Sequence, residues 1–381
     1  MINILYMSHF SDLRMGGQRS MTHLIERLNR KKYRPFALCP EKGELSVKLL
    51  SLDCPVFHVP MYSLKPKYIL KCLPEAFRIR KILKEYKIDI IHSDYPSDTY
   101  FAHLARLGTK TKVIWHVRWN VPARKDRLFE KSYDGIIGVS EAAGKRFKLE
   151  DPEINKKYQT IYNGVDIDEF SPLDNKSDLR KKLDLPNNQF ILLFAGVRKV
   201  GKGIFDILNA QVIIKNNNNN LPLMVFIGGD QANDNREKMN KLTEENNISE
   251  DVRILPPQSN VSDWMRAADT IAIPSHEGNE GMPRVSIEAQ CCGVPLILSD
   301  AGGVAEAIGD EKRAGIVVGQ NSPQDIAGAI QKIMSDESLA KEMSEAGRKR
   351  GEEFFDIKIH ARKVEKFYEY ILSDYDMELT K

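Results

Sequence analysis

Two glutamates eight positions apart stand out as groups that could hold a polyhydroxylated ligand. Glu280 ends a polar loop, residues 275–281, and Glu288 lies in a helix that we expect to begin at Pro283, because proline suits the first helical position. At helical rise the two carboxylates are roughly 12 Å apart. Carboxylates accept hydrogen bonds from sugar hydroxyls and repel phosphates. The pair therefore predicts hydroxyl groups at both ends of a ligand. The alternative is a solvated loop glutamate and a helix-surface glutamate.

The backbone between the two glutamates is suited to an anion. The amides of Gly281 and Met282 directly precede the expected helix. Backbone N–H groups and the helix dipole favour negative charge at such a position. Together with the glutamates, this segment predicts a ligand with hydroxyls at its ends and negative charge in its middle.

The elements around this segment indicate a parallel sheet. An apolar strand, 270–274, precedes the loop, Gly293 is placed to end the helix, and the run 294–298 reads as the next buried strand. A strand–loop–helix–strand unit puts the loop at the carboxyl end of the sheet, where open α/β sheets bind ligands.

A second loop carries cations. Arg198, Lys199 and Lys202 follow an apolar strand, 190–196, and Gly203 precedes a helix, 204–214. Cations on a glycine-containing loop after a parallel strand suit a phosphate. Without further context, exposed loop charges would be the better interpretation.

The N-terminal half offers weaker candidates. Gly16 and Gly17 follow a buried strand, Asn3–Met7, and precede a helix expected over 20–30, but the pattern is neither G-x-G-x-x-G nor a P-loop. Taken alone they read as a β–α turn. His116 lies near the end of a strand, 113–117, and could bond a sugar hydroxyl or be structural.

Alternating apolar and polar segments continue along the chain and predict an α/β protein. Further strands are expected over 35–39, 56–59, 88–92, 135–140, 223–229, 252–255 and 316–318, and further helices over 68–86, 323–335, 337–352 and 357–373. Pro74 is expected to divide the helix over 68–86 or to open its longer part.

Size and composition indicate a globular protein with two or more domains. The chain has 381 residues and a formal net charge of +3. Residues 1–170 hold 30 Lys+Arg and 20 Asp+Glu, so this half is basic and the remainder acidic. Such asymmetry can signal an anionic partner, such as a membrane surface, although a solvated lysine-rich surface is about as good an explanation.

The sequence shows no apolar run of 18 residues, no signal-peptide pattern and no CxxC pair among its five cysteines. We therefore expect a reduced, cytoplasmic setting and no structural metal.

The motifs together resemble retaining glycosyltransferases of family 4, the glycosyl transferases group 1. EGMPRVSIEA resembles the family's E-x7-E signature, and PSHEG, CCGVPLILSD, AGGVAEAI and QTIYNGVDIDEFSP match its usual context. The resemblance covers nearly the whole chain. It implies the GT-B fold: two Rossmann-like domains facing across a cleft, residues 1–172 and 173–356, with a C-terminal helix, about 357–381, that crosses back to the first domain.

The resemblance also implies roles for individual residues. Lys202 and Arg198 would neutralise the leaving diphosphate, although the family's spacing places its arginine at Val197, so Lys199 is a substitute. Glu280 would hold the donor sugar and Glu288 the ribose. The implied site is completed by Gly281, Met282 and Pro283, by the Gly16–Gly17 loop, and by His116 beside the donor sugar.

The implied reaction transfers a sugar from a nucleotide-diphosphate donor, expected to be UDP-linked, to a hydroxyl of a glycan or lipid-linked acceptor. The expected setting is polysaccharide or glycolipid assembly at the inner face of a membrane. We expect no cofactor, no metal and no nucleic-acid partner. The alternatives are a GT-B-like sugar-nucleotide epimerase or phosphorylase, and a non-catalytic sugar-nucleotide-binding protein.

Overall fold

The chain forms two compact units, each an α/β sandwich built on its own parallel sheet. The computed structural model describes residues 1–13, 16–62, 68–120, 126–217, 219–229, 235–278, 280–311 and 313–376. Unit 1 comprises residues 1–164 and 357–381, and unit 2 comprises residues 165–356. The boundary between the units therefore lies after Gly164, whereas the sequence analysis placed it after Pro172. Val165 already belongs to unit 2, because its N–H donates to the Phe355 carbonyl at 2.8 Å.

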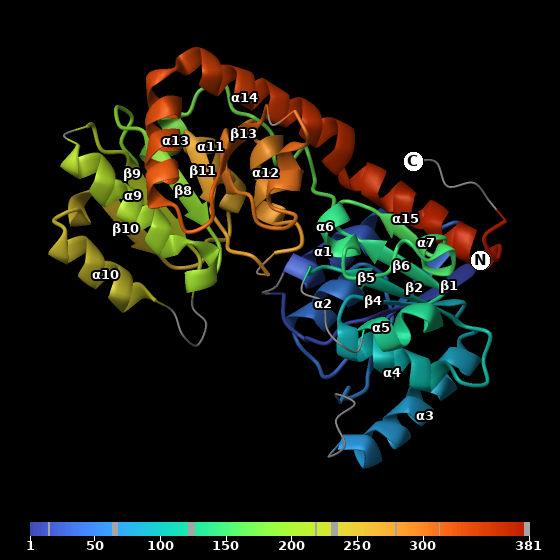
Figure 1. The fold of residues 1–381 in the computed structure, drawn as a ribbon. Helices are drawn as coiled ribbons and strands as arrows, with labels where there is room; N and C mark the ends of the chain where they lie inside the picture. Colours follow the sequence, from blue (N-terminus) through green and yellow to red (C-terminus); the bar gives the residue numbers. More distant parts are fainter. Residues whose placement is uncertain are drawn as a thin grey trace. The chain divides into compact units, whose positions relative to one another are not determined.

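Unit 1 is organised around a seven-stranded sheet of order β3-β2-β1-β4-β5-β6-β7, in which every pairing is parallel (Figure 1). Its strands are β1 (Ile2–Met7), β2 (Tyr33–Cys39), β3 (Val56–His58), β4 (Ile90–Ser93), β5 (Lys112–Val117), β6 (Gly135–Gly138) and β7 (Tyr158–Thr160). The strand order reverses between β1 and β4. Ligands of open α/β sheets bind outside the carboxyl ends of the strands at such a switch point.

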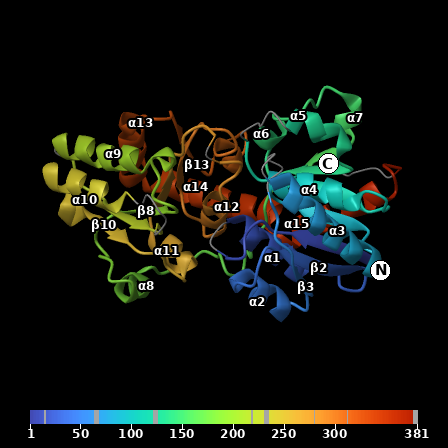
Figure 2. The same ribbon diagram turned by 90° about the horizontal axis from the view of Figure 1, so that it is seen from below.

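Helices cover both faces of this sheet (Figures 1 and 2). They are α1 (Gly16–Arg27), α2 (Glu44–Ser51), α3 (Ile69–Glu85), α4 (Pro96–Arg106), α5 (Asp126–Phe129), α6 (Glu141–Gly144), α7 (Pro152–Asn155) and α15 (Ile357–Leu372). One core cluster joins α1, α2 and α15 to alternate residues of the strands, among them Ile4, Leu24, Ile90 and Phe367. The last helix is thus part of this unit's hydrophobic core, where its burial stabilises the sheet.

Unit 2 repeats the topology with six parallel strands in the order β10-β9-β8-β11-β12-β13. They are β8 (Ile191–Ala195), β9 (Leu223–Ile227), β10 (Val252–Leu255), β11 (Thr270–Ile273), β12 (Leu296–Ser299) and β13 (Gly315–Val318). The switch point here lies between β8 and β11. Apart from Thr270 at the start of β11, both strands are apolar, and they are almost completely buried, as expected for parallel strands covered on both faces.

The helices of unit 2 also lie on both sides of its sheet (Figure 1). They are α8 (Ser177–Lys182), α9 (Ile204–Asn216), α10 (Arg236–Glu245), α11 (Val261–Ala267), α12 (Arg284–Cys291), α13 (Pro323–Ser335) and α14 (Glu337–Arg350). A second core cluster joins α9 and α13 to the sheet through residues such as Ile207, Phe226, Ile297 and Ile330. Among the described residues, no helix combines the length and apolar content needed to cross a bilayer.

At three points the helices differ from the sequence-based expectations in a way that has a clear physical reason. Helix α1 begins at Gly16 rather than Ser20, so the two glycines form its first turn. Helix α3 continues through Pro74 without dividing. Leu70, whose carbonyl loses its helical partner there, is 82% exposed, so water can bond that carbonyl. Pro283 precedes α12 with ψ 128°, an extended value, so the first helical residue is Arg284.

Candidate functional site

The loops after β8 and β11 meet at the switch point of unit 2. The His276 N–H, in the loop after β11, donates to the Gly201 carbonyl, in the loop after β8, at 2.9 Å. Gly203 has φ 72°, and a Cβ there would lie 2.2 Å from the Pro274 carbonyl oxygen. Glycine tolerates both this backbone conformation and the close approach, so it allows the two loops to pack together.

This packing brings Lys202 to Glu280, the two residues that the sequence placed in separate loops. The Lys202 ammonium and the Glu280 carboxylate form an ion pair, and the side chains are 22% and 19% exposed. Burial lowers the pKa of Lys202 to about 8, and the nearby Lys199 charge acts in the same direction. Lys202 is therefore a partly exposed cation, and its partner, Glu280, is itself a candidate ligand-binding residue.

Arg198 occupies a different position from the exposed loop cation that the sequence indicated. It is completely buried, and its guanidinium donates to the carbonyl oxygens of Gly228 and, at 2.8 Å, Leu255. Gly229, at φ 97°, permits this, since a Cβ there would lie 2.2 Å from the guanidinium carbon. Arg198 therefore ties the loop after β8 to the ends of β9 and β10, while Lys199 remains exposed. Its role toward a phosphate stays a prediction.

Glu288 lies on α12, one turn after Arg284, and the two form an ion pair. The Arg284 guanidinium reaches the same carboxylate oxygen with two nitrogens, at 2.9 and 3.1 Å. Both side chains are 11% exposed, so the carboxylate is held in one orientation. The sequence analysis did not identify Arg284, although the i, i+4 spacing of Arg and Glu on a helix was a readable signal.

Gly281, Met282 and Pro283 connect Glu280 to α12 and are all buried. The Pro283 carbonyl accepts hydrogen bonds from the Ser286 N–H at 3.1 Å and from the Ser286 hydroxyl at 2.6 Å, which anchors the start of the helix. The Gly281 and Met282 amides thus lie in a turn just ahead of the helix N-terminus.

A histidine that the sequence analysis missed joins this site. His276 Nε2 lies 2.7 Å from a carboxylate oxygen of Asp206, in the first turn of α9. The pair links the loop after β11 to the helix after β8 a second time. Nothing in the local sequence connects two residues 70 positions apart.

The switch point of unit 1 also gathers candidate residues. Gly17 lies beside Arg118, since a Cβ on Gly17 would be 3.3 Å from Arg118 Cδ. The Arg118 guanidinium binds both carboxylate oxygens of Asp94, at 3.0 and 3.2 Å, and Asn163 at 2.8 Å. Burial alone would raise the pKa of Asp94, but Arg118 and His92 lower it below its ordinary value.

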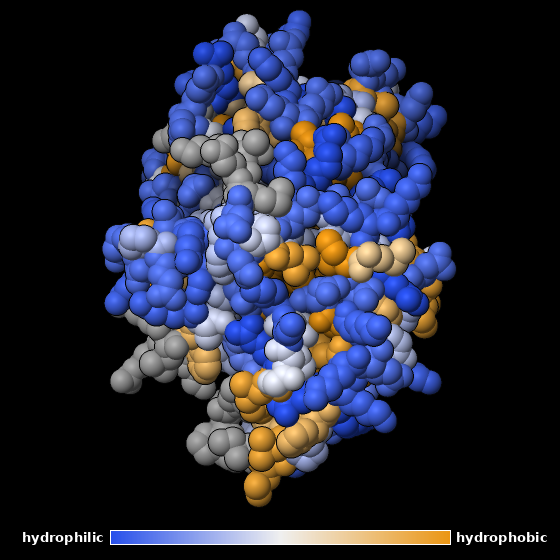
Figure 3. Space-filling view, turned by 90° about the vertical axis from the view of Figure 1, so that its right-hand side faces the viewer, coloured by the Kyte–Doolittle hydropathy of each residue, from blue (hydrophilic) through white to orange (hydrophobic). Residues whose placement is uncertain are grey.

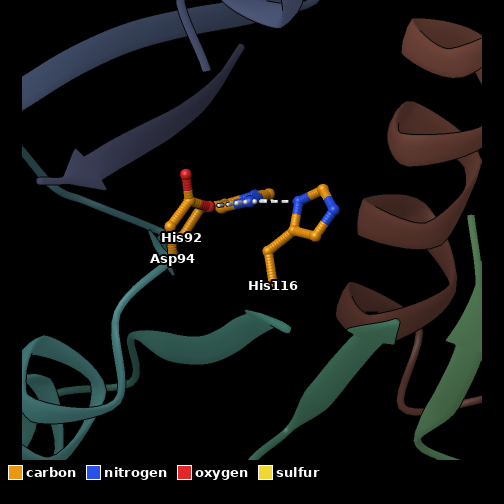
Figure 4. A group of neighbouring side chains, drawn as sticks. All are labelled: His92, Asp94 and His116. Carbon is orange, nitrogen blue, oxygen red and sulfur yellow. Dashed lines mark hydrogen bonds and ion pairs between the residues drawn. The ribbon is translucent and has the colours of Figure 1, made fainter. Parts of the chain in front are cut away.

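His116 lies deep in unit 1, next to His92 (Figure 4). His116 Nδ1 is 3.1 Å from His92 Nε2, and His92 Nδ1 is 2.6 Å from the hydroxyl of Tyr368 on α15. Burial lowers the pKa of both histidines, and the Arg118 charge adds to the effect on His116. His116 is therefore neutral near pH 7. Its Nε2 is buried and has no hydrogen-bond partner among the described residues, and the whole side chain is buried, so its role toward a donor sugar stays a prediction.

His92, Asp94 and His116 are also residue types that can bind a metal ion. His92, Asp94 and His116 offer three ligand atoms within 4.8 Å of one another (Figure 4). However, Arg118 supplies positive charge to both Asp94 oxygens, and each histidine already shares a hydrogen bond with the other. A divalent cation would have to displace the guanidinium, so we assign this cluster to hydrogen bonding.

A further pair, of a histidine and an aspartate, involves the loop after β1, where the sequence analysis named no site residue before Gly16. His9 Nδ1 is 2.9 Å from a carboxylate oxygen of the fully buried Asp98, and the ring stacks on Tyr95 with centroids 4.5 Å apart. The hydrogen bond that His9 donates to the Asp98 carboxylate raises the pKa of His9, outweighing burial. His9 is thus oriented at the carboxyl edge of the sheet.

The comparisons with known proteins agree with this architecture. Residues 175–350 match the sequence model of the family described as "Glycosyl transferases group 1", and residues 15–169 match that of "Glycosyltransferase Family 4". The D-inositol 3-phosphate glycosyltransferase of Streptomyces bingchenggensis is 30% identical over 290 residues. That alignment covers 70% of this chain but 63% of the relative, less than two thirds of its length.

Solved structures share the fold at low sequence identity. A glycosyltransferase from Rickettsia africae has a TM-score of 0.84 and 22% identity, covering 97% of this chain and 98% of its own. Anabaena HepE in complex with UDP and glucose has a TM-score of 0.80 and 16% identity, covering 96% and 99%. The predicted pair of Rossmann-like domains is thereby confirmed. The chain belongs to the family 4, group 1 glycosyltransferases.

Proposed function

We propose that the protein is a retaining glycosyltransferase that takes its sugar from a nucleotide-diphosphate donor, bound at the switch point of unit 2. The observation that carries the proposal is the meeting of Lys202 and Glu280 ahead of α12, which itself carries Glu288. A UDP-linked donor is supported by the UDP and glucose named for Anabaena HepE, a protein of the same fold.

In this proposal the donor separates the ion pair. The diphosphate takes the Lys202 ammonium and the amides of Gly281 and Met282, and the freed Glu280 carboxylate accepts hydrogen bonds from the sugar. Glu288, oriented by Arg284, accepts hydrogen bonds from the ribose hydroxyls. In this exchange the diphosphate replaces Glu280 as the anionic partner of Lys202, and the sugar hydroxyls satisfy the Glu280 oxygens by hydrogen bonding.

The transfer step then depends on stabilising the leaving group and positioning the acceptor. The bond from the anomeric carbon to the phosphate oxygen breaks, and UDP leaves with the electron pair. The acceptor oxygen bonds the anomeric carbon on the same face, and its proton passes to the departing phosphate. In unit 1 the acceptor would meet the Gly16–Gly17 turn, and the role of His116 toward a sugar hydroxyl stays a prediction.

The proposed acceptor is a glycan or lipid-linked alcohol used in polysaccharide or glycolipid assembly, reached at the inner face of an anionic membrane. The name of the Streptomyces relative adds a phosphorylated polyol to the acceptors that merit testing.

Thermal shift with a panel of nucleotide sugars, followed by turnover with candidate acceptors, tests the proposal. We expect a UDP-sugar to raise the melting temperature, because it binds only the folded state. An NMR spectrum of the product should show the donor's anomeric configuration. Conversion of donor without acceptor would identify an epimerase, and binding without turnover across the panel would identify a non-catalytic protein.

A further inference from the structure

Helix α3 exposes a stripe of large apolar side chains on unit 1. Leu70, Leu73 and Phe77 are 82%, 45% and 61% exposed. Their spacing of three and four residues places them on one face of the helix. The opposite face is already buried in the unit through Cys72, Ala76, Ile79 and Leu83, among others. The outward stripe is therefore additional to the apolar surface that folding requires.

Basic side chains surround this stripe. Helix α3 carries five basic and two acidic residues. Lys71, Arg78, Lys81 and Lys84 are exposed. Lys81 and Lys84 continue the apolar stripe along the same face at helical spacing. One of the two acidic residues, Glu75, is paired with Arg78 at 2.8 Å. The lysines of the helix therefore outnumber the one remaining acidic residue.

The helix is held firmly enough to present this face in one orientation. The Arg80 guanidinium donates to the carbonyls of Leu104 and Ala105 at 3.0 and 3.1 Å, and both residues lie in the last turn of α4. The same guanidinium lies 4.9 Å from the centre of the Phe77 ring, which fixes that ring at the surface. Helix α3 lies at the bottom of Figure 1, and Figure 3, which keeps the same vertical direction, shows hydrophobic surface at its bottom.

We propose that the outer face of α3 docks on an anionic lipid leaflet, with Leu70, Leu73 and Phe77 entering the interface and the lysines contacting lipid headgroups. The inference rests on the proposed function, in which a lipid-linked acceptor is met at a membrane, and it names the surface that makes this contact. An apolar stripe flanked by lysines is the pattern of helices that lie in a membrane interface. Anionic headgroups attract such basic clusters.

Charge argues against a second copy of the chain as the occupant. Two copies meeting through this face in a symmetric dimer would bring Lys81 and Lys84 of one copy against the same surface of the other. Their repulsion would oppose the gain from burying three side chains. An anionic bilayer can bury the apolar stripe and also supply negative charge to the lysines.

The test is co-sedimentation of the full chain with vesicles of phosphatidylcholine alone or with about one third phosphatidylglycerol, at low salt. We expect binding to the anionic vesicles only. The triple substitution Leu70→Ser, Leu73→Ser, Phe77→Ser should weaken it by about tenfold or more, and Lys81→Gln with Lys84→Gln should weaken it and reduce its salt dependence. The matched control is Val47→Ser with Leu50→Ser on α2, which removes two apolar side chains that are 70% and 57% exposed and should leave binding unchanged.

Equal binding to neutral vesicles, no binding, or equal losses in the control and the α3 variant would overturn the proposal. A wild-type dimer in solution that the α3 variant abolishes, without vesicle binding, would assign the face to a second copy. Thermal shift with UDP, measured without vesicles, separates this outcome from the proposed function. The α3 variant should keep the thermal shift with UDP. If the wild type showed no thermal shift with UDP, that result would count against the proposed function. The vesicle experiment would still test membrane docking by α3, independently of the proposed function.

Discussion

Lys202 and Glu280 form an ion pair although 78 positions separate them in the chain. The pair joins the loops after β8 and β11, the two strands that flank the switch point of unit 2. The charges of the two side chains thus neutralise each other. A nucleotide sugar offers each partner a replacement, a diphosphate for the lysine and hydroxyls for the glutamate.

Removing the ammonium should weaken every diphosphate ligand. Lys202→Ala is expected to lower the affinity for UDP on the order of 10- to 100-fold, since a hydrogen bond to a charged group contributes about 1.5–3 kcal/mol. Isothermal titration calorimetry measures the change. Lys241→Ala, at a lysine whose side chain is 75% exposed on α10, is the control and should bind UDP normally. Equal affinities of the Lys202 variant and the control would remove Lys202 from the site.

Neutralising Glu280 should separate binding from turnover. Glu280→Gln removes the carboxylate that competes with the diphosphate for Lys202, so UDP should bind as tightly as to the wild type or more tightly. Transfer from a UDP-sugar should nevertheless fall at least tenfold, because the amide oxygen of glutamine is a weaker hydrogen-bond acceptor for the sugar than the charged carboxylate. A variant that lost UDP affinity but retained kcat would contradict this division of roles.

Glu288 is expected to recognise the ribose and not the phosphates. Glu288→Gln should weaken UDP binding several-fold while leaving pyrophosphate, which has no ribose, unaffected. Arg284→Gln should have a similar but smaller effect, because it frees the carboxylate from its fixed orientation. Competition of both ligands against a labelled UDP-sugar provides the measurement, and parallel losses for UDP and pyrophosphate would place Glu288 elsewhere.

Donor affinity should depend on pH through Lys202. Its pKa is lowered from 10.5 to about 8, so its positive charge is present below pH 8 and is lost as the pH rises through that value. Because a diphosphate favours the charged form, the Kd for UDP should rise between pH 7 and pH 9. Lys202→Arg keeps its charge over this range and should show no such rise. A wild-type Kd that does not change with pH would show that another group supplies the charge.

The contact between the two loops should be sensitive to one methyl group. Gly203→Ala forces a Cβ against the Pro274 carbonyl at φ 72° and should cost about 1–3 kcal/mol of folding free energy, together with UDP affinity. Gly108→Ala is the matched control, because Gly108 has φ 74° but no atom within 4 Å of the added Cβ. Chemical denaturation should show a smaller loss for the control and no change in its UDP affinity.

Local patterns predicted most of the strands, because buried parallel strands read as short apolar runs, but they did not predict helices such as α2, α4, α10 and α11. Helix α13 and strand β10 begin and end where the sequence placed them. The first turn of α1 was missed because Gly16 and Gly17 have low helix propensity, and Pro74 was misread because an exposed carbonyl tolerates its missing partner. These errors reflect tertiary context that overrides local preference.

The sequence named candidate residues but not the pairings among them. It named Glu280 and Glu288 from their types and spacing, and Lys202 from the resemblance of its loop to the family, and the roles of all three toward a ligand stay predictions. It could not show that Arg198 turns inward, because the carbonyls that bind it belong to Gly228 and Leu255, on other strands. The contact of Arg118 with Asp94 was unpredictable for the same reason.

The most direct test of the central claim is a crystal structure of the full chain with UDP. The account predicts the diphosphate within hydrogen-bond distance of Lys202 Nζ and the Gly281 and Met282 amides, the ribose on Glu288, and the Lys202–Glu280 pair broken. Phosphates bound away from the start of α12, with that pair intact, would contradict it.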